Sequence, residues 1–267
     1  MLVALGQHES VRGDVAANLA RMDKTVTESG ADLVVFPELF LTGYNARDGH
    51  MRLAEALDGP SVAAVKGMAK ASGATVVFGM PERDPLRRGV MYNSAVVVRP
   101  DGTADAYRKY SPANFGPFEE KIFFASGSEL PVFDTPVGRL GLFICYDTFF
   151  SEIHKAYALQ GADILVGISA GPLTSRPLFE ALTLASAIEN GCAVIFCNLV
   201  GTQLQFPFFG GSHIVGPRGD VIVRGPYFQD TVVKGEVDLK EVELSRPLRP
   251  TIKDSRPEAF DIIRRLF

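Results

Sequence analysis

The sequence predicts an α/β fold of four layers, an α-β-β-α sandwich made of two pseudo-repeated βαβαββ-type halves. Apolar runs of strand length alternate with stretches of helical periodicity along most of the 267 residues. The motif Gly-Ala-Asp followed by three apolar residues occurs at 30–35 and returns at 161–166. The turns at 100–102 and 217–219 follow strands at the same place in each half. Two such halves can pack their sheets face to face, although the motif is also a common helix-to-strand turn.

The first half begins with a short apolar run at residues 2–7 that is typical of a buried strand. A helix follows, because apolar residues recur at helical spacing from Val15 to Val26, behind Asp14 as the expected cap. The apolar run at 33–36 ends at Pro37 and predicts the second strand. The remaining elements are a helix at 61–72, a strand at 75–80, and a hairpin of strands at 94–98 and 103–108.

The second half repeats this order after a long loop. The expected elements are strands at 139–144, 164–167, 193–198, 212–216, 221–223 and 231–238 and helices at 151–160 and 177–190. One domain is therefore expected over residues 1–241. The tail at 242–267 contains three prolines before an apolar stretch, so we expect it to be extended and then helical, packing on the domain or on a partner subunit.

Charge and composition exclude several classes of protein. The chain has 27 Lys plus Arg against 31 Asp plus Glu and a net charge of −4, so nucleic-acid binding has no electrostatic basis. The first residues contain no basic segment and no run of about 18 apolar residues follows, so we expect no membrane association and a cytoplasmic location. Three cysteines, an odd number, argue against a disulfide framework.

Sequence signatures of nucleotide and zinc sites are missing, so we expect no cofactor and no metal. Cys192 and Cys197 would need two further ligands nearby to bind a metal, and we interpret both as core thiols. The histidines show no paired spacing and are assigned surface or structural roles; they are His8, His50, His154 and His213.

One segment imitates the nucleophile elbow of serine hydrolases. Residues 167–171 match G-x-S-x-G after a strand, with Ser169 at the centre. The elbow should run directly into a helix, whereas residues 172–176 look like a loop. The order Ser, acid, His would end at His213, and no aspartate lies between the two residues. A serine hydrolase is therefore not favoured.

Cys145 stands at the end of the buried strand, just ahead of a helix. Backbone N–H groups at a helix entrance stabilise a thiolate, so this thiol is expected to be nucleophilic below its ordinary pKa of about 8.5. Glu38 occupies the equivalent junction in the first half, Lys109 ends the last strand of that half, and Glu120 follows. The alternatives are a structural cysteine, a loop-capping carboxylate and two solvated surface residues. Together the four supply a nucleophile, a base, a cation and a second carboxylate.

These residues lie in motifs that resemble the nitrilase superfamily, the carbon–nitrogen hydrolases. The segments that resemble those carrying the family's catalytic Glu, Lys and Cys are residues 30–38, 107–109 and 142–147. Residues 120–124, with Gly127 beyond, resemble the segment that holds the family's second Glu, which favours Glu120 over Glu119. The resemblance runs in order from about residue 2 to 240 and makes residues 1–241 a carbon–nitrogen hydrolase domain.

The resemblance implies an αββα fold and hydrolysis of a non-peptide C–N bond. Cys145 would attack the carbonyl carbon while Glu38 takes its proton. Lys109 and the Tyr146 backbone N–H would hold the oxyanion. Glu38 would then protonate the leaving ammonia and activate the water that splits the thioester, with Glu120 orienting Lys109 and the substrate. Neither a metal nor a cofactor is implied.

The substrate class follows from the nucleophile segment. The Cys-Tyr-Asp of residues 145–147 is closer to amidase-like members than the Cys-Trp-Glu of true nitrilases, which favours small linear amides. Residues 112–121 and 209–212 also resemble the glutaminase domain of glutamine-dependent NAD synthetases. An N-carbamoyl-amide hydrolase releasing CO2 and ammonia, or a nitrilase, remains open. A non-catalytic binding module is opposed by the complete catalytic set.

Substrate binding is assigned to Tyr44, Phe115, Ser169 and Phe206. The aromatic cluster at 204–209 either lines the acyl pocket or fills the core. We further expect a homodimer or a higher homo-oligomer, because the resemblance implies pairing across one face and the tail ends in an apolar stretch.

Overall fold

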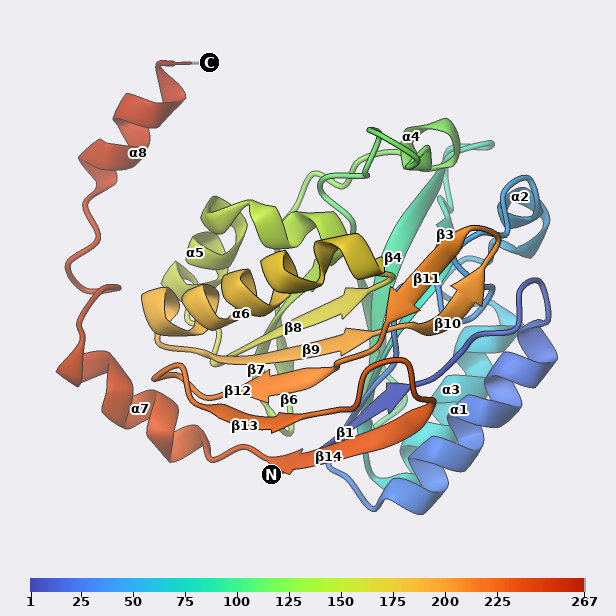
Figure 1. The fold of residues 1–267 in the computed structure, drawn as a ribbon, viewed down its shortest axis with the longest axis horizontal. Coiled ribbons are helices and arrows are strands. Elements are labelled where there is room, and N and C mark those ends of the chain that lie inside the picture. Colours follow the sequence, from blue (N-terminus) through green and yellow to red (C-terminus); the bar gives the residue numbers. More distant parts are fainter. Residues whose placement is uncertain (267) are drawn as a thin grey trace.

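The computed structural model describes residues 1–266 and contains two six-stranded sheets (Figure 1). The first sheet has, in spatial order, β14 (Thr231–Glu236), β1 (Leu2–Gln7), β2 (Leu33–Val35), β3 (Thr75–Arg83), β4 (Met91–Val98) and β5 (Ala104–Arg108). The second has β13 (Val221–Arg224), β12 (His213–Val215), β9 (Ala193–Asn198), β8 (Ile164–Ser169), β7 (Gly138–Ile144) and β6 (Val132–Thr135). A separate hairpin is formed by β10 (Val200–Gln203) and β11 (Phe206–Phe209).

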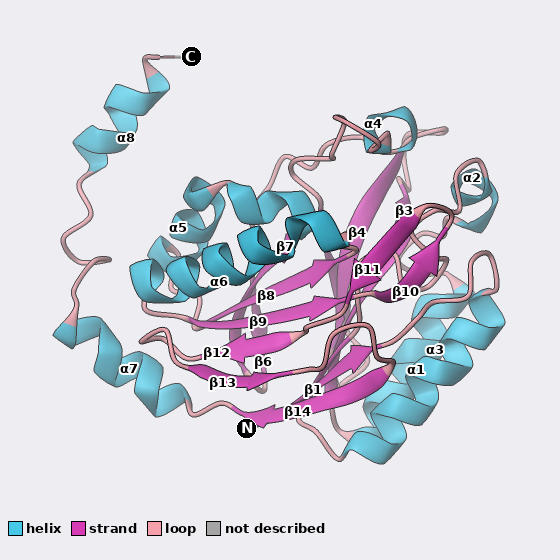
Figure 2. Cartoon of the chain, in the orientation of Figure 1, coloured by secondary structure: helices cyan, strands magenta, loops and turns pink. Residues whose placement is uncertain are grey.

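Helices cover the outer face of each sheet, as Figure 2 shows. The first sheet is covered by α1 (Val15–Ser29) and α3 (Pro60–Ser72), and the second by α5 (Ser151–Leu159) and α6 (Arg176–Asn190). The short helices are α2 (Gly49–Leu53) and α4 (Glu120–Phe123), with single 3-10 turns at Cys145–Phe149 and Leu173–Ser175. The predicted four-layer α-β-β-α sandwich is confirmed.

The two halves repeat one topology. β1, β2 and β3 run parallel in one sheet and β7, β8 and β9 run parallel in the other, each followed by two antiparallel strands. The Gly-Ala-Asp motif has the same function in both halves. Asp32 accepts a hydrogen bond from Leu2 N–H at 2.7 Å, and Asp163 accepts one from Arg139 N–H at 3.1 Å. Each aspartate therefore ties the start of one strand to the start of its parallel neighbour.

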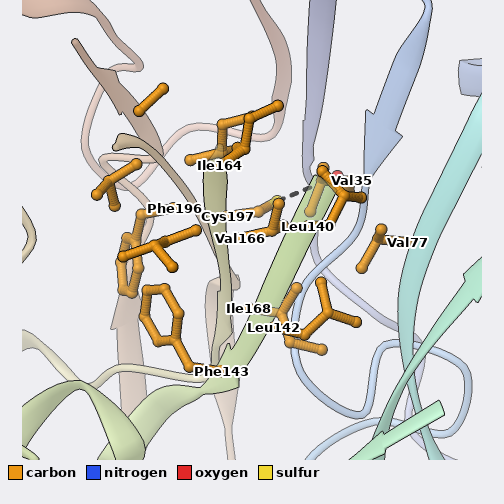
Figure 3. Packing of buried hydrophobic residues seen from close by; sticks show 14 of the residues in the cluster. Val35, Val77, Leu140, Leu142, Phe143, Ile164, Val166, Ile168, Phe196 and Cys197 are labelled. Carbon is orange, nitrogen blue, oxygen red and sulfur yellow. Dashed lines mark hydrogen bonds between the residues drawn. The ribbon is translucent and has the colours of Figure 1, made fainter. Parts of the chain in front are cut away.

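The hydrophobic core between the sheets is seen in Figure 3. Val35 and Val77 of the first sheet face Leu142 and Ile168 of the second, and all four are fully buried. Cys197 is also buried here, and its thiol donates to the Val35 carbonyl oxygen at 3.2 Å (Figure 3). Cys192 is equally buried and free, so the interpretation of both residues as core thiols is confirmed.

The tail differs from the expected extended segment at its start. α7 (Leu239–Leu248) continues the chain as a helix through the position of the expected domain boundary after residue 241. Asp238 caps this helix by accepting from Lys240 N–H at 3.0 Å, and buried Val242 anchors it to the core. Pro247 sits in the last turn, where the helix stops soon afterwards. α8 (Pro257–Arg264) then projects away from the rest of the chain (Figure 1).

Candidate active site

The four predicted catalytic residues come from both halves and meet just beyond strand ends. Glu38 follows β2, Lys109 follows β5, and Glu120 opens α4. Cys145 follows β7 and begins a 3-10 turn. The expected equivalence of the Glu38 and Cys145 junctions is wrong, because β2 corresponds to β8 in the repeat while β7 corresponds to β1. The two residues are therefore brought together by the packing of the sheets and not by the repeat.

The Glu38 loop folds closely onto β3. Gly79 N–H donates to Pro37 O at 3.2 Å, and Leu41 N–H donates to Gly79 O at 3.1 Å. A Cβ at Gly79 would overlap the backbone of Pro37 and Leu39, so only glycine allows this approach. The loop geometry fixes the Glu38 carboxylate, which is fully buried.

Lys109 lies between two carboxylates and has no exposed side-chain surface. Its Nζ is 2.7 Å from Glu38 Oε1, and it is 2.9 Å and 2.8 Å from the two oxygens of Glu120. The backbone of Lys109 is held as well, because its N–H donates to Asn93 O at 2.8 Å. The buried ammonium is thus paired on two sides, which is the condition under which a charge is tolerated in a protein interior.

Both carboxylates are surrounded by donors. Glu38 accepts from Asn93 Nδ2 at 2.7 Å and from Ala170 N–H at 2.8 Å. Glu120 accepts from the Tyr44 hydroxyl at 2.7 Å and from Ala113 N–H at 3.1 Å. Each oxygen of the two carboxylates therefore faces a donor, and at Glu38 the hydrogen bonds from Lys109 and Ala170 oppose the rise in pKa that burial causes.

Burial and charge act on the site in opposite directions. Burial lowers the pKa of Lys109, but Glu120 and Glu38 outweigh it, and the pKa of Lys109 lies well above its ordinary value. Burial raises the pKa of Glu38, with Lys109 opposing the rise. Lys109 therefore remains a cation at neutral pH, and Glu38 is a stronger base than an exposed carboxylate.

The thiol of Cys145 does not behave as expected from its position in the sequence. Burial raises its pKa well above the ordinary value, the charge of Glu38 raises it further, and Lys109 opposes both. The expectation of nucleophilicity below the ordinary pKa is wrong in this respect. The resting residue is a thiol, and it needs a base at the moment of attack.

Comparison with known proteins points to the same chemistry. The chain matches the family described as carbon–nitrogen hydrolase over residues 2–247. The chain belongs to the carbon–nitrogen hydrolase family. It is 33% identical over 258 residues to a probable nitrilase of Schizosaccharomyces pombe, covering 92% of each chain. It is 29% identical over 265 residues to an omega-amidase of Homo sapiens, covering 96% of this chain and 94% of that one.

Structural similarity agrees with this family. An amidase structure from Nesterenkonia sp. superimposes with a TM-score of 0.83 at 27% identity, covering 98% of this chain and 95% of that one. The predicted membership of the nitrilase superfamily is confirmed, and the protein is a carbon–nitrogen hydrolase.

A small cavity in this carbon–nitrogen hydrolase opens beside Glu120. Its volume is about 40 Å³, and Tyr44 and Phe206, two of the predicted binding residues, line it together with His50. Tyr44 and Phe206 are nearly buried. A cavity of this volume can hold only a small chemical group, such as a short alkyl chain.

The other two predicted binding residues lie elsewhere around Cys145. Phe115 is 49% exposed and packs against Tyr146 with ring centroids 4.8 Å apart. Ser169 is fully buried, and its hydroxyl acts on the Cys145 thiol, whose pKa it lowers against the larger effect of burial. The cavity does not include either residue.

The aromatic cluster at 204–209 divides between the two expected roles. Phe206 lines the cavity and packs on Phe118 at 5.7 Å between centroids. Phe208 and Phe209 are fully buried and fill the core, while Leu204 is 45% exposed. The hairpin β10-β11 therefore contributes one aromatic side chain to the cavity and two to packing.

Several residues of the site were not found from the sequence. Asn93 and the Ala170 N–H bind Glu38, and His50, which was given a structural role, lies 3.1 Å from Tyr44 O through its Nε2. A polar residue inside the apolar run of β4 is the signal that could have revealed Asn93. A backbone N–H such as that of Ala170 leaves no signal in the sequence.

Neither a serine-hydrolase site at Ser169 nor a metal site is assembled in the described part of the chain. His213 contacts Thr183 Oγ1 at 2.7 Å and Gly211 O at 2.9 Å, so both ring nitrogens are engaged away from Ser169. Within residues 1–266 no group of three or more His, Cys, Asp or Glu side chains is arranged to hold a metal ion. Metal-independent activity remains a prediction.

Proposed function

We propose that this carbon–nitrogen hydrolase cleaves small linear amides into a carboxylic acid and ammonia through a thioester on Cys145. The observation that carries the proposal is the buried Lys109, held between Glu38 and Glu120 at 2.7 Å and 2.8 Å. The charges of Glu38 and Lys109 both act on the Cys145 thiol. A nucleophile, a base and a cation are thus grouped where water is excluded, and electrostatic interactions are strong in such a place.

In the acylation step, Cys145 Sγ attacks the carbonyl carbon as Glu38 accepts the thiol proton. The carbonyl oxygen becomes an oxyanion, and Lys109 Nζ and the Tyr146 N–H stabilise it. Lys109 keeps its proton, since the two carboxylates raise its pKa, and acts as a fixed positive charge. The C–N bond then breaks as Glu38 returns the proton to nitrogen, and ammonia leaves.

In the deacylation step, Glu38 accepts a proton from a water molecule that attacks the thioester carbon. A second oxyanion forms at the same place and collapses, so the C–S bond breaks and the thiol is restored with the proton from Glu38. Glu120 orients Lys109 throughout, and Tyr44 orients Glu120 through its hydroxyl at 2.7 Å.

The proposed substrate class is supported by the cavity and by the relatives. The cavity of about 40 Å³ lies beside Glu120 and is not lined by Cys145, and we propose that it receives the end of a short acyl chain. In one structure, a mutant of the Nesterenkonia amidase carries the acetamide moiety of fluoroacetamide on its active-site cysteine. A small primary amide is therefore the first substrate to test.

Two other substrate classes remain as alternatives on the same machinery. An N-carbamoyl amide would give CO2 and ammonia, and a nitrile would consume a second water. The nitrile is favoured by the similarity to a probable nitrilase and the amide by the similarity to an omega-amidase.

The deciding experiment measures ammonia and CO2 from the purified protein with acetamide, propionamide, glutamine, propionitrile and N-carbamoyl-β-alanine. The proposal expects ammonia without CO2 from the amides, lost in Cys145→Ala and in Glu38→Gln. Turnover of propionitrile alone, or CO2 release from the carbamoyl compound alone, would replace the amidase assignment. Full activity after treatment with a chelator is also expected, and loss restored by a divalent ion would contradict metal independence.

We also propose a homo-oligomer, at least a dimer. α8 exposes Phe260, Ile262 and Ile263, and the turn after it exposes Leu266, with exposed fractions of 40, 60, 52 and 78%. The helix projects from the body of the chain (Figure 1), and its apolar side chains stay exposed among the described residues 1–266. A second copy of the chain would cover these side chains, and the homo-oligomer expected from the sequence remains a proposal.

The cytoplasmic location also remains a proposal. Within residues 1–266 no helix has both the length and the apolar character needed to span a bilayer. Fractionation of cells that express the protein tests the location directly.

A further inference from the structure

A third carboxylate, Asp147, lies at the site with no part in the reaction proposed above. Its side chain is fully buried. Asp147 accepts from the Tyr107 hydroxyl at 2.7 Å and from Ser111 N–H at 2.8 Å. It also accepts from Ile144 N–H at 3.1 Å. A buried carboxylate is costly unless donors stabilise it, so a group held in this way is expected to fix the position of what it binds.

The first two donors stand on either side of Lys109. Tyr107 precedes Lys109 by two residues and Ser111 follows it by two. The Tyr107 hydroxyl also accepts from Tyr110 N–H at 3.1 Å, so the chain just after Lys109 is fastened to the same group. The backbone that carries the Lys109 ammonium is therefore anchored to Asp147 from both directions.

The third donor belongs to the nucleophile segment. Ile144 is the residue before Cys145, and Cys145 has a φ of +46°, a left-handed conformation that is strained for a residue with a side chain. The bond from Ile144 N–H closes the turn over Cys145 and holds it in this conformation. β5, which precedes Lys109, and β7, which precedes Cys145, belong to different sheets. Asp147 thus joins the two sheets at the point where their catalytic residues meet.

We infer that Asp147, together with Tyr107, is a positioning device that fixes the Lys109 ammonium relative to Cys145 and the Tyr146 N–H. This inference rests on the proposed function, in which the Lys109 ammonium and the Tyr146 N–H both donate to one oxyanion. Because these two donors follow strands of different sheets, their relative position must be fixed. Donors held in advance act without rearrangement when charge develops, and small displacements weaken them strongly. Asp147 acts through the Tyr107 hydroxyl and the backbone N–H groups of Ser111 and Ile144, so we class it as a positioning residue.

The crucial variant is Tyr107→Phe. It removes the side-chain bond between the Lys109 segment and Asp147 and the acceptor of Tyr110 N–H, while the backbone bonds from Ser111 and Ile144 to Asp147 stay in place. Tyr157→Phe is its matched control. Tyr157 packs beside Tyr107 with centroids 6.4 Å apart, is fully buried, and its hydroxyl has no partner in the described part of the chain. The two variants lose the same atom from neighbouring buried rings.

Two reactions of Cys145 distinguish the position of the oxyanion donors from the reactivity of the thiol itself. Iodoacetamide alkylates sulfur at a saturated carbon and displaces iodide, so no oxyanion forms. Propanal adds to sulfur at a carbonyl carbon, Glu38 accepts the thiol proton, and the oxygen of the adduct develops negative charge, so its affinity reports on the oxyanion donors. Neither reaction requires hydrolytic turnover.

The expected result for Tyr107→Phe is a loss in kcat of about tenfold to hundredfold, since a hydrogen bond to a charged group is removed. KM should stay within about twofold, propanal should bind about tenfold more weakly, and the alkylation rate should stay within about twofold. Asp147→Asn should lose more in kcat and should also slow alkylation. Tyr107→Phe should then cost less than about twofold in the Asp147→Asn background, because the negative charge to which the Tyr107 hydroxyl donates is already gone.

Three outcomes would overturn the inference: Tyr107→Phe matches Tyr157→Phe in propanal affinity, alkylation falls in parallel with propanal affinity, or the two substitutions are additive. A lowered thermal midpoint with unchanged propanal affinity would show a merely structural role. If the wild-type protein hydrolyses no amide, the proposed function fails, and the propanal and iodoacetamide results still decide the role of Asp147.

Discussion

Replacing Lys109 with methionine removes the cation between two buried carboxylates, and two effects are expected. Loss of one oxyanion donor should lower kcat by about 10²- to 10³-fold. In the wild-type protein, Glu38 and Glu120 lie 2.7 Å and 2.8 Å from Lys109 Nζ. The substitution leaves both buried carboxylates without this shared counter-ion. Removing one member of a buried ion pair costs about 3–5 kcal/mol of folding stability. The variant should therefore be both inactive and less stable.

The stability loss should depend on pH with a definite sign. Without Lys109, burial and the charge of Glu120 raise the pKa of Glu38 further above its unfolded value of about 4.3, because the cation that opposed the rise is gone. A group whose pKa is raised on folding stabilises the protein below its unfolded pKa, and this contribution is lost as pH rises through the folded pKa. The deficit relative to wild type should be small near pH 4 and should grow toward neutral pH.

Thermal or urea unfolding at several pH values measures this deficit. Arg108→Met is the matched control, because Arg108 is the adjacent residue and its partner, Glu82, lies outside the site. The double variant Lys109→Met with Glu120→Gln removes one of the two carboxylate charges, so it should recover part of the stability and none of the activity. A Lys109→Met protein with kcat within tenfold of wild type, or with a deficit that is the same at every pH, would refute the reasoning.

Three further outcomes are expected. Asn93→Ala removes a donor 2.7 Å from Glu38, so the pKa of Glu38 should rise further and the acid limb of kcat/KM should move up by about one pH unit; an unmoved limb would exclude this contribution. Phe206→Ala should enlarge the cavity and raise kcat/KM for hexanamide relative to propionamide by about tenfold; an unchanged ratio would remove Phe206 from the acyl pocket. A chain ended at Arg256 lacks α8 and should sediment as a smaller species than the full chain, whereas an unchanged species would show that α8 takes no part in assembly.

The order of the main strands and helices could be predicted because each element carries its own periodicity. The repeated Gly-Ala-Asp motif also identified the pseudo-repeat, and its structural basis is the bond from Asp32 to Leu2 and its counterpart in the second half. The helix through Val242 was missed, since three prolines suggested an extended tail while the cap at Asp238 preceded the segment considered. The sequence therefore predicted the helices and strands whose own residues determine their conformation.

The catalytic residues could be predicted from motifs, but their surroundings could not. The partner of Asn93 is Glu38, 55 positions away, and nothing near either residue in the sequence indicates that they meet. The raised pKa of Cys145 depends on burial by both sheets and on the charge of Glu38. The roles of Tyr107 and Asp147 depend likewise on a contact 40 positions apart. Long-range contacts decide the chemistry of this site, and they emerge only on folding.

The central claim is that Cys145 carries the acyl group during hydrolysis, and mass spectrometry of the intact protein tests it most directly. The protein is mixed with propionamide, quenched in acid within the first turnover, and digested to locate the adduct. The expected result is a propionyl mass on the peptide that contains Cys145, lost on adding hydroxylamine as propionohydroxamate appears. Ser169→Ala should retain the adduct and Cys145→Ala should lose it together with all hydrolysis. Hydrolysis that continues in Cys145→Ala, or an adduct on Ser169, would contradict the account.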